Sequence, residues 1–116
     1  MTMNWYELYY VAKANRLESM MTCSLNSSIN WCEDGLRIVS WSYNMVASGK
    51  SESIEDVFRK YSHLNIDRRR KKQIRSICIG DVIVFDGVPW IVTGFGFSQI
   101  PDFLWKKVID NAEKGK

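Results

Sequence analysis

The sequence has few of the residues on which catalytic and metal sites are usually built. Its 116 residues include one histidine, three cysteines and two prolines. No apolar run approaches the roughly 20 residues of a membrane-spanning helix, because Asp81 and Asp86 interrupt the most hydrophobic stretch. The first residues lack a basic segment followed by an apolar one, so no signal peptide is expected. These absences exclude membrane insertion and predict a cytoplasmic protein.

The few reactive side chains form no catalytic or metal-binding pattern. His63, the single histidine, falls at the expected end of a helix, where its imidazole would interact favourably with the negative end of the helix dipole. The three cysteines, Cys23, Cys32 and Cys78, show no metal-ligand spacing, and free thiols are the expectation in a reducing compartment. The spacing of Cys23 and Cys32 leaves a disulfide between them open. No metal, cofactor or enzymatic activity is predicted.

The phosphate-binding signals are incomplete as well. Gly49-Lys50-Ser51 precedes a predicted helix, but the glycine that a phosphate loop needs five residues before Gly49 is replaced by Asn44. Gly94-Phe95-Gly96-Phe97-Ser98 is superficially similar to a phosphate loop, but it lacks the third glycine, the Gly-Lys-Ser/Thr ending and a long helix directly after it. Nucleotide hydrolysis is therefore not expected.

Length and composition predict one α+β domain spanning residues 1–112, followed by a frayed tail at 113–116. The high density of aromatic residues in residues 5–11 predicts a strand there. Residues 12–21 show an ambiguous helical spacing, and residues 22–30 are predicted to be a loop. Leu36 to Tyr43 is predicted as a second strand, with Val39, Trp41 and Tyr43 facing the core and the polar residues 48–51 ending the segment.

The second half gives the clearest local signals. Apolar residues at helical spacing from Ile54 to Tyr61, with Ser53 before them and Asp56 three residues on, predict a helix over 53–63 that covers a small antiparallel sheet. Asp86-Gly87 between β-branched runs predicts a two-residue hairpin joining strands at about 77–85 and 88–95. Pro89 places the start of the second strand at an edge or a non-paired position.

A second helix is predicted over 102–112. Asp102 is suited to cap it. Its apolar face would come from Phe103, Leu104 or Trp105, Val108 and Ile109.

The net charge of +3 is unevenly distributed. Six cations lie within eight residues without an acid among them: Arg68, Arg69, Arg70, Lys71, Lys72 and Arg75. Such a cluster suits phosphates, because each neutralised phosphate releases counterions, and it equally suits an acidic protein surface. It is also compatible with a solvated loop. No aromatic residue interleaves the run, so stacking on single-stranded bases is not supported.

Aromatic residues give a second indication of partner binding. Five Trp, five Tyr and five Phe exceed what one small core easily buries. Some of them should lie on the surface, where Trp and Tyr favour partner contacts.

The stretch from Val57 onward resembles a known family. The matching segments are Val57-Phe58-Arg59-Lys60 with Asn65, Arg75 to Val84, Gly87, Trp90-Ile91-Val92 and Gly94 to Phe97. Together they resemble the YodL-like domain, a small module of phage, plasmid and bacterial mobile-element proteins, over about residues 36–100. The chain departs from that pattern at Ser76-Ile77-Cys78, where the family has Ser-x-Ser, and in the basic segment before Arg75.

The resemblance implies an accessory protein of a mobile element, working in a bacterial cytoplasm, and brings no catalytic residues. We therefore expect a non-enzymatic binding module that interacts with a host protein or complex through an acidic surface of that partner, for example as an anti-defence inhibitor. The alternative is a nucleic-acid-binding protein using the Arg68 to Arg75 cluster on phosphates. The sequence gives no oligomeric state.

Overall fold

A computed structural model describes residues 3–24, 35, 37–62, 75–94 and 96–114 of the chain. Its centre is a five-stranded antiparallel sheet with the strand order β2-β1-β3-β4-β5. The strands are β1 (Asn4–Val11), β2 (Tyr43–Ser51), β3 (Val82–Phe85), β4 (Val88–Thr93) and β5 (Gly96–Gln99). This confirms the predicted small α+β fold.

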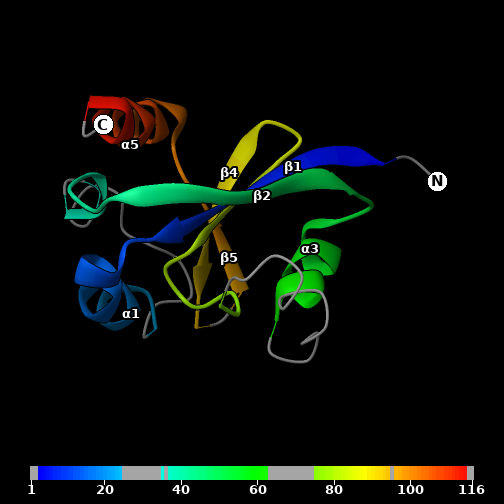
Figure 1. Cartoon of the computed structure of the whole chain (residues 1–116), viewed down its shortest axis with the longest axis horizontal. Coiled ribbons are helices and arrows are strands. Elements are labelled where there is room, and N and C mark those ends of the chain that lie inside the picture. The colour runs from blue at the N-terminus through cyan, green and yellow to red at the C-terminus, as the bar shows by residue number, and fades with distance from the viewer. Residues whose placement is uncertain (1–2, 25–34, 36, 63–74, 95, 115–116) are drawn as a thin grey trace.

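Helices pack on both faces of the sheet (Figure 1). On one face, α5 (Asp102–Lys114) buries Leu104 and Val108 against Val82 and Ile91. On the other face, α3 (Ile54–Tyr61) buries Val57 and Tyr61 in a second core cluster. Side chains alternate along the strands, so β1, β2, β3 and β4 each contribute to both clusters.

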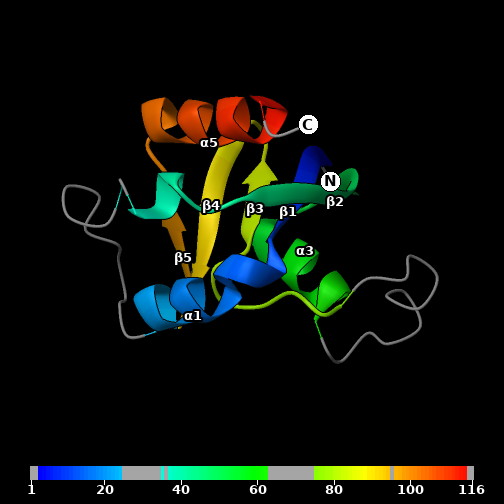
Figure 2. The same cartoon turned by 60° about the vertical axis from the view of Figure 1, so that its left-hand side comes forward.

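A third helix closes one end of the sheet. After β1, the chain forms the short 3-10 helix η1 (Lys13–Asn15) and then α1 (Arg16–Ser24). Figure 2 shows α1 below the strands, on the side away from α5. The carbonyl of Cys23 accepts a hydrogen bond from the N–H of Gly94, just after β4. No described helix is long and apolar enough to cross a membrane.

Both predicted helices are confirmed. Ser53 is the N-cap of α3, and its hydroxyl accepts a hydrogen bond from the N–H of Asp56. The helix ends at Tyr61, two residues earlier than expected. α5 begins at Asp102 and runs through Lys114, into the predicted tail. Phe103 does not join its apolar face: the ring is 64% exposed, while Leu104 and Val108 face the core.

The predicted hairpin is also confirmed, with positive φ angles at both turn residues, 52° at Asp86 and 78° at Gly87. The first strand starts later than predicted, at Val82, because residues 78–81 form a turn in which Gly80 has a φ of 97° and the N–H of Asp81 donates to the carbonyl of Cys78. β4 lies inside the sheet, so the edge position for Pro89 was wrong. The alternative, a non-paired position, holds only toward β5. Pro89 is paired with Val84 of β3, whereas the ladder with β5 ends at Trp90 and Gln99, and beyond it the N–H of Ile100 donates to the carbonyl of Pro89.

The second predicted strand, Leu36 to Tyr43, was wrong. Residues 37–39 are helical, and the strand β2 begins only at Tyr43. Turn hydrogen bonds bring Ile38 and Trp41 into the core together, three residues apart. The polar residues 48–51 do not end the strand but belong to it, because β2 is an edge strand that pairs only with β1 and leaves alternate side chains in solvent.

Candidate partner-binding surface

The predicted basic cluster is described only at its last member. Arg68, Arg69, Arg70, Lys71 and Lys72 lie outside the described residues. Arg75 is described, and its side chain is only 25% exposed. The structure thus tests the environment of one of the six cations.

Arg75 forms a two-pronged ion pair with Asp81, a fully buried residue. Its Nη1 and Nη2 donate to Oδ2 and Oδ1 of the carboxylate, each at 2.7 Å. The guanidinium also lies 4.1 Å from the ring centre of Tyr10. Burial alone would lower the pKa of Arg75, but the hydrogen bonds and the charge of Asp81 raise it above its ordinary value. Arg75 is therefore a structural anchor rather than a cation free for phosphates.

Asp81 accepts two further hydrogen bonds, from the backbone N–H groups of Val11 (3.0 Å) and Cys78 (2.7 Å). Both oxygens are thus occupied by one backbone donor and one guanidinium donor each. A carboxylate held in this way has no lone pair directed at a substrate. We assign to it the role of fastening the loop before β3 to the end of β1.

Tyrosine hydroxyls fasten the same loop. Tyr10 donates to the carbonyl of Arg75 at 2.9 Å, and Tyr43 donates to the carbonyl of Gly80 at 2.8 Å. Burial, followed by the charge of Asp81, raises the pKa of Tyr10, so its hydroxyl stays a donor at physiological pH. These tyrosines hold the backbone in place.

The reactive residues of the described part are dispersed. Cys23 is buried in the core and Cys78 lies near Arg16, with a sulfur–nitrogen distance of 4.0 Å. His63 and Cys32 lie outside the described residues, so the possible disulfide of Cys32 is not tested. Among the described side chains, no three His, Cys, Asp or Glu residues come together as metal ligands.

The most distinctive exposed surface lies on the α5 face of the sheet. α5 covers the half near the end of β1, where Trp105 packs edge-on against Tyr9 and Tyr43. No described helix covers the other half, where β1 begins. We call this part the open half-face; it comprises Trp5, Glu7, Met45, Ser48 and Lys50, and it borders on Val84, which is buried in the core cluster under α5.

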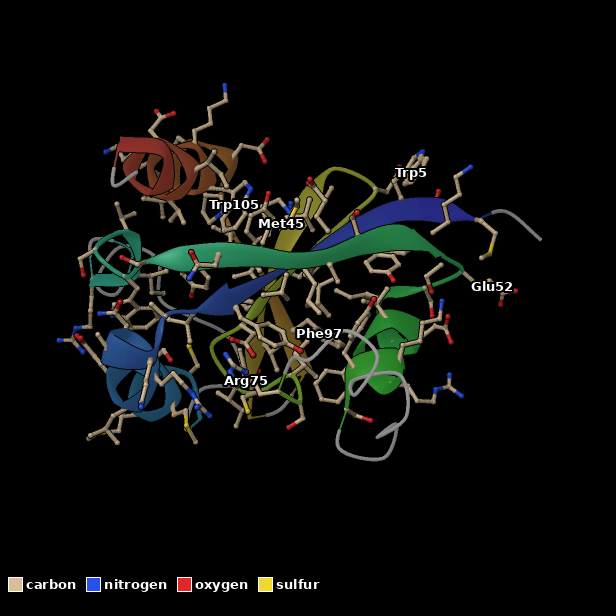
Figure 3. The ribbon with its side chains drawn as sticks, viewed as in Figure 1. Trp5, Met45, Glu52, Arg75, Phe97 and Trp105 are labelled. Atoms are coloured by element: carbon tan, nitrogen blue, oxygen red, sulfur yellow. The ribbon has the colours of Figure 1, made fainter. Side chains whose placement is uncertain are left out.

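Large apolar side chains of the open half-face are in solvent. Trp5 is 65% and Met45 55% exposed. Figure 3 shows Trp105, Met45 and Trp5 following one another along the same side of β1 and β2. The register explains this placement: Met45 is opposite Tyr9, and Lys50 is opposite Trp5. A bulge at Leu8/Tyr9 leaves Val46 as the extra residue of β2 and keeps Met45 and Ser48 on one face.

The sequence predicted that some aromatic residues would be exposed, without saying which. The strong strand pattern of residues 5–11 places Trp5, Glu7 and Tyr9 on one face, which could have identified Trp5 as a sheet-face residue. The course of α5, which decides what is covered, was not available from local patterns.

A smaller apolar surface was missed altogether. Helix α1 turns Leu17, Met20 and Met21 outward and buries Ser19, the reverse of an ordinary amphipathic helix. The structure gives no indication of what would cover these three side chains.

Comparison of the chain with family models, with curated proteins and with solved structures gives no significant match. The resemblance to the YodL-like domain therefore stays a prediction from the sequence.

Proposed function

We propose that this chain is a non-enzymatic binding module that docks on a partner protein through the open half-face. The observation that carries the proposal is the 65% exposure of Trp5 on a rigid, hydrogen-bonded strand, with the 55% exposed Met45 further along the same sheet face, opposite Tyr9. Tryptophan is the residue type most enriched at the energetic centres of protein interfaces, and a strand holds it without a large entropic cost of ordering. The resemblance described above supports a host protein as the partner and a mobile element as the source of the chain.

We predict that Trp5→Ala weakens capture of the partner about 30-fold or more, because truncating a residue at the energetic centre of an interface costs about 2 kcal/mol or more. The measurement is a quantitative pull-down from bacterial lysate with the full chain as bait. Phe103→Ala is the matched control, because Phe103 is 64% exposed but lies on α5. Both variants should keep the stability of the unchanged protein to within about 0.5 kcal/mol, since exposed side chains contribute little to folding. Equal capture by the unchanged protein and by Trp5→Ala would contradict the proposal.

The basic run Arg68 to Lys72 supports a second candidate function, contact with nucleic acid. Its five cations are consecutive, and each phosphate contact makes the affinity fall with salt. We predict that Arg68→Ala, Arg69→Ala and Arg70→Ala together abolish any low-salt gel shift of duplex DNA or RNA. Arg75→Ala is unsuitable for this test, because it removes the ion pair with Asp81. If the unchanged protein gives no shift at low salt, this candidate function is excluded.

A further inference from the structure

The open half-face contains a shallow depression of about 400 Å³. Its walls come from three strands and the hairpin turn: Trp5, Tyr6, Glu7, Ser48, Val84 and Gly87. The depression is thus lined by the indole of Trp5, the carboxylate of Glu7, the hydroxyl of Ser48 and the apolar side chain of Val84. Such a combination of an apolar wall and a few polar groups is typical of a pocket for one side chain of a partner.

The one charged side chain among the described residues that line this depression, Glu7, is acidic, although the whole chain is positive. Glu7 forms no ion pair with any described residue, and its carboxylate helps to raise the pKa of Tyr9, after the larger effect of burial. A second carboxylate, that of Asp86, belongs to the adjacent turn, where the Asp86 N–H donates to the carbonyl of Trp5 at 2.9 Å. The local charge therefore selects a cation.

The indole of Trp5 already attracts a cation of the chain itself. Nζ of Lys50 lies 4.7 Å from the ring centre. At an exposed site this contact is weak and readily exchanged. A planar guanidinium stacks on an aromatic ring and pairs with a carboxylate at once, so it would replace the ammonium of Lys50 favourably.

We propose that the depression binds an arginine side chain of the partner protein, which stacks on Trp5 and pairs with Glu7. This proposal rests on the proposed function and names the chemistry of the partner at the same surface. An acidic segment or a nucleic-acid phosphate would meet Glu7 and Asp86 and be repelled. The depression thus prefers a cationic group, whereas the run Arg68 to Lys72 would prefer an anionic one.

The test is selection of displayed random dodecapeptides on the full chain, with Trp5→Ala as the counter-target. We expect peptides that depend on Trp5 and are enriched in arginine. Peptides that depend on Trp5 without such enrichment would overturn the arginine proposal and leave the proposed function standing. If no selected peptide depends on Trp5, both proposals fail.

Two charge variants then test the proposal, because they are expected to change the affinity in opposite directions. For a selected peptide, we expect Glu7→Gln to raise the Kd about 3- to 10-fold and Lys50→Gln to lower it about 2- to 5-fold, as an exposed ion pair and a competing cation imply. Glu52→Gln, which removes the same charge beyond the end of β2 and away from Trp5 (Figure 3), should leave the Kd unchanged.

An equal loss of affinity in Glu7→Gln and Glu52→Gln, or a loss in Lys50→Gln, would overturn the assignment. So would concentration-dependent dimerisation that Glu7→Gln abolishes, because the arginine would then come from a second copy of this chain.

Discussion

Replacing Asp81 with asparagine is expected to lower the free energy of unfolding by about 3–5 kcal/mol, the cost of removing one partner from a buried ion pair. Asparagine is nearly the same size, so the loss does not come from a cavity. Each oxygen of Asp81 accepts one backbone N–H and one guanidinium N–H. Asparagine replaces one of these oxygens with an NH₂ group, so two N–H donors then face another donor. Flipping the side-chain amide does not help, because the two oxygen positions face the same kinds of donor.

The matched control is Asp86→Asn. Asp86 is exposed, occupies a turn position with φ 52° that asparagine tolerates, and should change the stability by less than about 0.5 kcal/mol. Denaturant unfolding followed by tryptophan fluorescence measures both variants. Should Asp81→Asn prove too unstable to purify, Arg75→Met gives a second test. It leaves the two backbone donors on the carboxylate, and it should still destabilise the protein by more than 1 kcal/mol.

A cost below about 1 kcal/mol for Asp81→Asn would mean that the loop is held mainly by Tyr10 and Tyr43. It would also return Arg75 to the basic cluster, because a guanidinium without a strong internal partner is available to phosphates. The stability of this one variant therefore bears on the function proposed for the basic run.

Local signals in the sequence predicted the parts of the fold that local chemistry determines. The cap at Ser53 and the Asp86-Gly87 turn are decided within four residues, by a hydroxyl and by tolerance of positive φ, and both were found. Tertiary contacts decided the rest. Leu36 to Tyr43 has the composition of a strand, yet Ile38 and Trp41 gain more by entering the core from a helical turn.

The candidate site was predicted less well than the fold. Composition predicted exposed aromatic residues but not which ones. Trp5 is exposed because α5 covers only the other half of its sheet face and leaves this half open. Arg75 looked like the last member of a basic run, and nothing in its sequence neighbourhood shows that Asp81, six residues later, returns to meet it across the Gly80 turn. Both outcomes depend on contacts between distant segments, which a single sequence does not reveal.

Gly80→Ala is the second variant with a large expected effect, a loss of about 2–6 kcal/mol from two separate causes. The first is the backbone: φ at Gly80 is 97°, which a residue with a β-carbon adopts only under strain. The second is space. A β-carbon at Gly80 would lie 2.6 Å from Oγ and 2.8 Å from Cβ of Ser19, a fully buried residue of α1.

Gly87→Ala separates the two causes. Gly87 also has a positive φ, 78°, but nothing lies within 4 Å of the β-carbon it would gain. It should cost only the backbone strain, about 1–3 kcal/mol. The excess in Gly80→Ala then measures the contact with Ser19, and adding Ser19→Gly should recover part of that excess, beyond the loss that Ser19→Gly causes alone. If both alanine variants unfold at the same denaturant concentration, α1 moves aside without a cost in free energy. The packing of α1 against the Gly80 turn would then not stabilise the fold.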